Sequence, residues 1–136
     1  MILKIITPTK KVVDREVISV TAPSVDGEIT ILPGHANLFS LLDDGIITIK
    51  DNKEEEYMAI GGGYLETDGS EIQILVSRAY NQDEIDEKLT EKALAEAKEI
   101  LKEGHDRQER TEAAALVRRS LIDLKLLKKR RRTARI

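Results

Sequence analysis

DGEITILPGHANLFSLLDDG, residues 26–45, holds the strongest structural signals in the chain. Asp26-Gly27 favours a tight hairpin turn, because glycine adopts positive φ without steric cost. Pro33-Gly34 predicts a type II turn, since proline presets φ at the first central position and glycine accepts the left-handed second position. Asp44-Gly45 indicates a third turn. The runs between the turns are alternating or mostly apolar, so they predict two strands, and the second must be covered on at least one face.

The rest of the first eighty residues follows the same pattern of short alternating runs between turn signals. Triple glycine 61–63 and the dipeptide Asp68-Gly69 are examples of these breaks. Turns about every eight to twelve residues are typical of an antiparallel sandwich or barrel. No helix-length period interrupts this region, which argues against parallel βαβ units.

The period becomes helical after Tyr80. One apolar stripe runs through residues 83–103, and it consists of Ile85, Leu89, Ala93, Ala97, Ile100 and Leu101. Acidic residues crowd the first turn of this segment, lysines lie near its end, and Gly104 is a natural C-terminal stop. A second helix is expected over roughly residues 108–129. We therefore predict two domains, a β domain of residues 1–80 and a helical hairpin of residues 81–136.

Alanine dominates the apolar faces of the first helix and the early second helix. At ~25 cal/mol per Å², burial of an alanine contributes well under half of what a leucine contributes. Ala, Glu, Lys and Leu are strong helix formers, so the hairpin forms readily while docking weakly. A stable helix that docks weakly can have more than one docking place.

Composition excludes several classes of protein. The chain has no cysteine and therefore no disulfide framework, thiol nucleophile or thiolate metal site. Its two histidines fall in different predicted domains, and it has no P-loop, Gly-x-Ser-x-Gly or His-Glu-x-x-His motif. The first apolar run, residues 1–6, is too short for a membrane span. We expect a soluble protein with no catalytic site, no metal and no cofactor.

Three features of the sequence allow more than one structural or functional interpretation. Gly61, Gly62 and Gly63 precede another strand and no helix, so a β-bulge or the close approach of another backbone is favoured over a phosphate loop; a partner's backbone would make this an interface. His35 is either a polar loop residue or a contact. After Asp123 the chain carries seven basic residues and no acid, which suits an acidic protein, a lipid headgroup or nucleic acid.

The whole chain resembles the epsilon subunit of the bacterial F-type ATP synthase. Residues 27–36 are similar to that family's Gly-Glu, alternating apolar, Pro-Gly-His-Ala motif, and AIGGGYLE, residues 59–66, resembles its second motif. The resemblance implies a ten-stranded β-sandwich followed by a helix-turn-helix, in the central stalk of a proton- or sodium-translocating enzyme. Such a subunit is non-catalytic and lies peripherally at the cytoplasmic face of the cell inner membrane.

The resemblance also implies partners. The sandwich is expected between the gamma subunit and the c subunits of the membrane rotor ring, with Glu28 and His35 as contacts. The helical hairpin either folds against the sandwich or extends into the catalytic hexamer of alpha and beta subunits, where it blocks ATP hydrolysis. Candidates for contact with an acidic segment of beta are Arg118, Arg119, Lys125, Lys128 and Lys129.

The family's ATP-sensing variant carries an Ile/Leu-Asp-x-x-Arg-Ala motif. Ile85 and Asp86 match it, but Leu89 and Thr90 replace the arginine and the alanine. Arg119 aligns with one nucleotide-contacting arginine, whereas Asp123 falls where another is expected. The first change removes a positive charge and the second adds a negative charge, and both disfavour binding of a triphosphate. We therefore predict weak or absent ATP binding. The alternative from another class is a stand-alone β-sandwich module whose basic helix engages nucleic acid.

Overall fold

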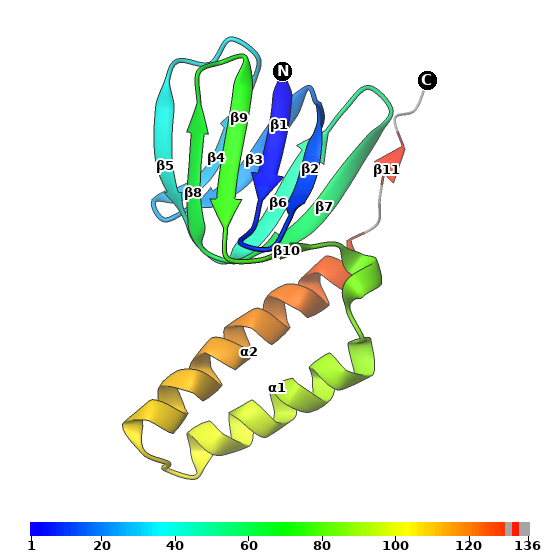
Figure 1. Ribbon diagram of the computed structural model, residues 1–136. Coiled ribbons are helices and arrows are strands. Elements are labelled where there is room, and N and C mark those ends of the chain that lie inside the picture. Colours follow the sequence, from blue (N-terminus) through cyan, green and yellow to red (C-terminus); the bar gives the residue numbers. More distant parts are fainter. Residues whose placement is uncertain (130–131, 134–136) are drawn as a thin grey trace. The chain divides into compact units, whose positions relative to one another are not determined.

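The computed structural model describes residues 1–129 and 132–133, and the chain divides into two compact units. The first unit is built on residues 1–81 and the second on residues 82–129 (Figure 1). Arg132–Thr133 forms the short strand β11, which pairs with β7 of the first unit, although the helical domain was expected to run to residue 136. Of the predicted basic tail, Arg130, Arg131 and Arg135 lie outside the described residues.

Ten strands make up the first unit over residues 1–81. They are β1 (Ile2–Ile6), β2 (Lys11–Glu16), β3 (Ser19–Ser24), β4 (Gly27–Ile31), β5 (Leu38–Leu42), β6 (Gly45–Lys50), β7 (Glu54–Ile60), β8 (Gly63–Thr67), β9 (Glu71–Val76) and β10 (Ala79–Tyr80). Their order in the sheet is β10-β7-β6-β3-β5-β8-β9-β1-β2, with β4 on β3. The predicted β-sandwich of about ten strands followed by two helices is confirmed (Figure 1).

The two layers of the sandwich meet at a narrow corner. β3 joins β5 through a single residue pair, Ser24 and Leu42. On the other side, Arg15 of β2 forms ion pairs with Asp51 at 2.7 Å and with Glu56 of β7 at 2.6 Å. These ion pairs link the edge strand β2 to the opposite layer, so the sheet is nearly closed.

One strand pair departs from the antiparallel pattern. β1 runs parallel to β9, with Ile2 opposite Glu71 and Ile6 opposite Leu75. The other described pairs are antiparallel. Turn residues specify hairpins between successive strands, but they contain no information about how the first strand pairs with one far along the chain. The parallel pair was therefore not predicted.

The core of the sandwich is aliphatic. Fully buried branched residues alternate along the strands, and they include Leu3, Ile5, Val20, Ile31, Ile47, Ile49, Ile60, Leu65, Ile72 and Ile74. Val, Ile and Leu suit pleated surfaces with one buried face, which explains why the period of two in the sequence becomes strands. Each such side chain contributes ~1.5–3 kcal/mol on burial, so the core strongly stabilises this unit.

The Pro-Gly turn has the predicted geometry. His35 N donates to Leu32 O at 3.1 Å across Pro33-Gly34, and Gly34 has φ +80°. A positive φ at the second central position is the type II requirement, which glycine meets without strain. The turn therefore presents His35 at a fixed position after β4.

The Asp44-Gly45 turn works differently from the prediction. β5 ends at Leu42 and β6 begins at Gly45, so the connection consists of Asp43 and Asp44. Gly45 does not adopt positive φ, and a Cβ there would lie 2.9 Å from Pro23 Cγ. Close packing by the proline ring of β3, and not turn geometry, explains this glycine.

The second unit is a helical hairpin. It contains the short 3-10 helix η1 (Gln82–Glu84), α1 (Glu87–Lys102) and α2 (Arg107–Lys128). Asp86 caps α1 by accepting from Leu89 N at 3.0 Å, and Asp106 caps α2 by accepting from Glu109 N at 2.9 Å. Gly104, with φ +73°, ends the first helix as predicted, whereas the predicted first turn at residues 83–86 is η1 and a cap.

Few large side chains are buried in this unit. The buried residue of α1 is Ala97, and those of α2 are Ala113, Ser120, Asp123 and Leu126. Gln82 closes the base of the hairpin, because its carboxamide Nε2 donates to Leu126 O at 2.6 Å and to Lys129 O. Within the described residues, no helix has the length and apolarity needed to cross a membrane.

Candidate partner-binding surfaces

Glu28 and His35 lie at opposite ends of β4. Glu28 is the second residue of the strand, opposite Pro23 of β3, and it is exposed. His35 follows the Pro-Gly turn beyond the other end of the strand and is half-buried. The two predicted contact residues therefore belong to two separate ends of the sandwich, and they do not form one site.

The His35 end is held against the turn between β8 and β9. Gly34 N donates to Gly69 O at 3.0 Å, and a Cβ on Gly69 would lie 2.6 Å from His35 O. The Nδ1 of His35 lies 2.7 Å from Ala36 O, which requires the proton on Nδ1, because a carbonyl oxygen only accepts. This contact fixes the orientation of the ring and leaves Nε2 as the nitrogen that can meet a partner.

The triple glycine lies at the Glu28 end. Residue pairing runs across the sheet from Gly27 to Ser24, then to Leu42 and to Gly63. Gly62 N donates to Asp44 Oδ1 at 2.9 Å, so the connection between β7 and β8 is bound to the connection between β5 and β6. The structure thus brings these glycines to the same end as Glu28 and away from His35.

Close packing within the chain explains two of the three glycines. A Cβ on Gly63 would lie 1.9 Å from Leu75 O, and one on Gly61 would lie 2.1 Å from Ser77 Oγ. Gly62 is different, since its Cβ would make an ordinary 3.5 Å contact with Leu42 O. At Gly63 the approaching group is the backbone of β9, whereas at Gly61 it is the side chains of Ser77 and Arg78. A further role of the triple glycine as a partner contact stays a prediction.

A row of exposed and half-buried apolar side chains crosses the outer face of the sandwich, and sequence reasoning did not assign it to a site. We define the apolar row as Phe39, Leu41, Tyr64, Leu75 and Ile6. Leu41 of β5 lies opposite Tyr64 of β8, Tyr64 opposite Leu75 of β9, and Leu75 opposite Ile6 of β1. Phe39 and Leu41 are 60% and 55% exposed, and Phe39 stacks on Tyr64 with ring centroids 5.2 Å apart. The apolar run LFSLL, which the sequence required to be covered, is the signal that could have found this surface.

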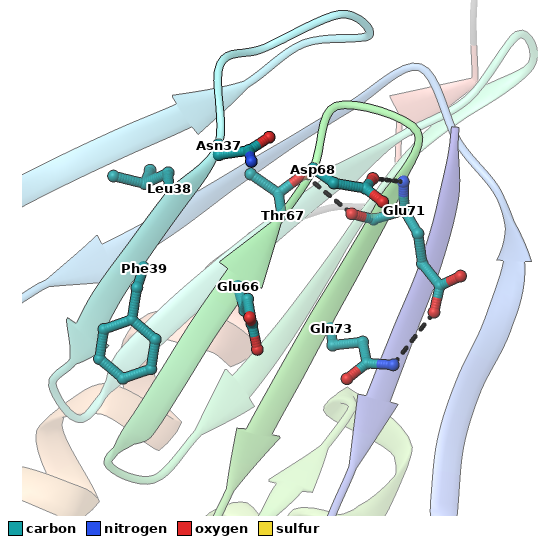
Figure 2. A pocket seen from close by; sticks show the side chains of 8 residues that line it. All are labelled: Asn37, Leu38, Phe39, Glu66, Thr67, Asp68, Glu71 and Gln73. Carbon is teal, nitrogen blue, oxygen red and sulfur yellow. Dashed lines mark hydrogen bonds between the residues drawn. The ribbon is translucent and has the colours of Figure 1, made fainter.

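A hollow of about 540 Å³ borders the apolar row at Phe39. Figure 2 shows the side chains that line it, which are Asn37, Leu38, Phe39, Glu66, Thr67, Asp68, Glu71 and Gln73. Asp68 caps the turn by accepting from Ser70 N at 2.9 Å and Glu71 N at 3.0 Å, and these backbone hydrogen bonds lower its pKa. Three carboxylates thus give the hollow an acidic character beside an aromatic edge.

Glu71 has two neighbours of its own. Gln73 Nε2 donates to Glu71 Oε1 at 3.1 Å, and Lys4 Nζ lies 3.2 Å from the same oxygen. The hydrogen bond from Gln73, followed by that from Lys4, lowers the pKa of Glu71. This carboxylate is therefore ionised at neutral pH and belongs to a surface network.

The predicted cationic residues of α2 are spread around the helix. Arg118 and Lys125 are seven residues apart, so they share one face, and both are exposed. Arg119 and Lys128 are also exposed. At 100° per residue, they lie about 80–100° around the helix axis from that face. Asp123 is buried, so its carboxylate does not interrupt the exposed charges. Lys129 follows the helix as its C-terminal cap.

Of the predicted nucleotide candidates, Asp86 is engaged in helix capping. The Asp86 side chain accepts from Leu89 N, and Asp86 O accepts from Thr90 Oγ1 at 2.8 Å. Leu89, in the place of the expected arginine, is 64% exposed. Ile85 precedes the cap, and Arg119 lies on the other helix. Across the part of the chain that the structure describes, no group of three or more His, Cys, Asp or Glu is placed to hold a metal ion.

Residues 1–82 match the family described as ATP synthase, Delta/Epsilon chain, beta-sandwich domain. The chain is 36% identical over 121 residues to the ATP synthase epsilon chain of Geotalea uraniireducens (strain Rf4), covering 88% of each protein. It is 39% identical over 99 residues to the ATP synthase epsilon chain of Carboxydothermus hydrogenoformans (strain ATCC BAA-161 / DSM 6008 / Z-2901), covering 73% of this chain and 74% of that one.

Two solved structures share the fold. A chain of the Euglena gracilis mitochondrial ATP synthase, OSCP/F1/c-ring in rotational state 1, superposes with a TM-score of 0.71 at 23% identity, over 94% of this chain and 77% of that one. A chain of the central stalk and c-ring of the Tetrahymena thermophila mitochondrial ATP synthase gives 0.66 at 14% identity, over 93% and 96%. At these identities the likeness shows the fold alone.

Proposed function

Because this chain belongs to the epsilon-chain family of ATP synthases, whose members are non-catalytic subunits, we propose that it joins the gamma subunit to the membrane rotor ring in the central stalk of an F-type enzyme. The coupled ion is a proton or sodium. The chain is then a peripheral component at the cytoplasmic face of the cell inner membrane. The Tetrahymena chain that shares the fold comes from a structure of a central stalk and c-ring, which supports this role.

The observation that carries the proposal is the apolar row. Its aromatic stack and exposed leucine lie on a rigid sheet, and aromatic and aliphatic side chains of this kind are enriched at the centres of protein interfaces. Monomeric proteins rarely leave such residues contiguous and exposed. The row belongs to the β5-β8-β9-β1 layer, whose opposite side forms the core. We assign this face to the gamma subunit.

The Glu28 end is assigned to the c subunits. Glu28 and the neighbouring Val25 are both exposed next to the turn between β3 and β4. A carboxylate beside an apolar side chain at a loop tip is suited to bind a polar loop of another subunit. His35, at the other end of β4, then belongs to the gamma contact.

The hairpin is proposed to regulate ATP hydrolysis. Its buried residues are few, and apart from Leu126 they are small or polar. A difference of a few kcal/mol is therefore proposed to separate the compact hairpin from a form in which α2 binds elsewhere. The exposed basic residues of α2 attract an acidic segment of the catalytic beta subunit, next to alpha. A two-state equilibrium of this kind responds to small changes in free energy.

Binding to gamma tests the first assignment. The double variant Phe39→Ser and Leu41→Ser is expected to weaken binding of the full-length chain to purified gamma by at least about tenfold in calorimetry, since interface anchors dominate affinity. Ile18→Ser is the matched control, because Ile18 is 40% exposed but lies outside the row. Equal affinities for the double variant and the control would refute the assignment.

Charge reversal tests the second assignment. Arg118→Glu with Lys125→Glu is expected to relieve inhibition of ATP hydrolysis in the assembled enzyme, whereas Lys88→Glu on α1 is the control for a change of charge on the hairpin. Unchanged inhibition by the double variant would remove this face from the mechanism.

Two expectations remain as proposals. We propose that ATP binds weakly or not at all, and a dissociation constant in the low micromolar range by calorimetry would contradict this. The nucleic-acid alternative predicts an affinity for duplex DNA that falls steeply with salt. An anisotropy titration at two salt concentrations tests it.

A further inference from the structure

The turn between α1 and α2 holds a histidine between two carboxylates. The Nε2 of His105 lies 3.0 Å from Glu103 Oε2, and its Nδ1 contacts the Glu109 carboxylate. Glu103 is the C-terminal cap of α1, and Glu109 lies in the first turn of α2. One side chain thus joins the end of one helix to the beginning of the next.

The chemistry of these contacts depends on protonation. An ionised carboxylate only accepts hydrogen bonds, and a neutral imidazole has one N–H. The neutral ring would therefore direct one nitrogen lone pair at a carboxylate, whereas the imidazolium donates to both partners. We propose that His105 is a protonation-dependent latch, which ties the two helices of the hairpin together in its charged form and releases one carboxylate in its neutral form.

Two other charged groups of the turn form hydrogen bonds to the backbone of the helices. The Asp106 carboxylate caps α2 through Glu109 N at 2.9 Å, and Arg110 Nη1 donates to Leu101 O, the last turn of α1, at 2.8 Å. Lys102 and Arg107 are the remaining charged residues between Leu101 and Arg110 apart from His105 and its two carboxylates. The groups that contact the imidazole are therefore both acidic.

The sign of the pH dependence follows from the pKa. Hydrogen bonds that the His105 ring donates to the Glu103 carboxylate, and then to that of Glu109, raise the pKa of His105 above 6.5. A group whose folded pKa is raised stabilises the fold fully below its unfolded pKa and loses that contribution as the pH rises through the folded pKa. The latch is therefore closed below the unfolded pKa and opens as the pH rises through the raised pKa of the folded state.

Apart from the latch, the hydrogen bond from Arg110 Nη1 to Leu101 O joins the two helices at this end, so loss of one carboxylate contact weakens a junction made of few bonds. α1 buries only Ala97 among its residues, and Gln82 ties the base of the hairpin at the opposite end. Opening the turn by raising the pH lowers the stability of the compact hairpin. The consequence for ATP hydrolysis rests on the proposed regulatory function, but the latch itself does not.

NMR on the full-length chain tests the latch without any partner. The ring carbon-bound protons of His105 are titrated in the native chain and in Glu103→Gln, Glu109→Gln and Glu99→Gln. We expect a pKa above 6.5 in the native chain, a fall in both variants that remove a carboxylate contact, and no change in Glu99→Gln, which alters an exposed glutamate elsewhere on α1. A native pKa at or below 6.5, or equal values in all four proteins, would overturn the proposal.

Amide hydrogen exchange supplies a second readout. Protection factors for residues 104–109 are compared between the native chain and His105→Gln at about pH 6 and about pH 9, which bracket the histidine titration. We expect roughly two- to fivefold higher protection in the native chain at the lower pH, as for an exposed ion pair, and equal protection at the higher pH. A ratio that is the same at both pH values would show that the contacts are structural and not a latch.

Discussion

Buried side chains of the sandwich are mostly branched aliphatics, whereas those of the helical hairpin are mostly small or polar. Ile72 and Ile74 are fully buried in the sandwich, and the residues buried in the hairpin include Ala97, Ala113 and Ser120. Burial of an isoleucine contributes ~1.5–3 kcal/mol, and an alanine contributes much less. The sandwich is therefore stabilised mainly by its buried core, and the hairpin mainly by hydrogen bonds at the ends of its helices. A rigid region suits permanent binding, and a marginal one suits a switch.

The end contacts of the hairpin are specific and polar. Gln82 binds carbonyl groups at the end of α2, Asp86 and Asp106 cap the helices, and His105 joins them at the turn. Each depends on one or two hydrogen bonds, so each can be lost without unfolding the sandwich. Equal effects of equivalent substitutions on the stability of the two regions would show that they do not differ in this way.

The largest expected effect concerns the triple glycine. Gly63→Ala places a Cβ against the backbone oxygen of Leu75, so we expect a loss of well over about 3 kcal/mol in unfolding free energy, or failure to fold. Gly62→Ala is the matched control, because its Cβ has ordinary contacts, and it should be tolerated. Urea unfolding of the two purified variants measures both. Similar stabilities would mean that β9 does not pack closely on this strand.

The next effect compares the two regions directly. Ile74→Ala should cost about 2–5 kcal/mol in the sandwich, because it leaves a cavity in a fully buried core. Ala97→Gly, at the buried position of α1, should cost about 1 kcal/mol through helix propensity. Denaturant unfolding followed by NMR signals of each region checks the difference. An equal loss in both would contradict the account of their interiors.

A smaller effect is expected at the helix caps. Asp86→Ala and Asp106→Ala each remove the acceptor for a helix N–H, which costs about 1 kcal/mol. Asn in either position retains the acceptor and should restore most of the stability. Circular dichroism at the helix band during thermal unfolding reports the loss. If alanine and asparagine behaved alike, the caps would contribute nothing to the hairpin.

The smallest effect is the acid sensitivity of the sandwich. Backbone hydrogen bonds from Lys53 and Glu54 lower the pKa of Asp51, and those from Ser70 and Glu71 lower that of Asp68. A lowered folded pKa gives stability that is present above the unfolded value of 3.8 and lost as the pH falls through the folded pKa. Asp51→Asn with Asp68→Asn should therefore be less stable than the native chain at neutral pH, and the difference should shrink below about pH 3. A constant difference across this range would exclude the two carboxylates as its cause. The hairpin should respond in the opposite direction, because the stabilisation by His105 is lost as the pH rises through its raised pKa.

Local signals predicted local features well. Pro33-Gly34 and Gly104 were interpreted correctly because a positive φ is a property of one residue and its turn. The position of both helices followed from the apolar period, and the acidic residues of its first turn also marked the start of the first helix. These features need no knowledge of distant segments.

Features that depend on distant segments were not predicted. Gly45 packs closely against Pro23, although the sequence indicated only a turn there. For Gly63 the close approach of another backbone was predicted correctly, but the sequence did not indicate that this backbone is β9. The parallel pairing of β1 with β9 and the bond of Gln82 to α2 also join residues far apart in the sequence. The apolar row was visible only in part, since four strands contribute to it. Glu28 and His35 were named from family resemblance, and their roles in binding stay predictions.

The central claim is that the sandwich binds within the stalk while the hairpin regulates. ATP hydrolysis by an F-type enzyme that lacks its epsilon subunit, reconstituted with either the full chain or a chain that ends at Asn81, tests this most directly. We expect both chains to bind gamma with similar affinity, and only the full chain to inhibit hydrolysis. Equal inhibition by the shortened chain, or a shortened chain that folds but does not bind gamma, would contradict the account.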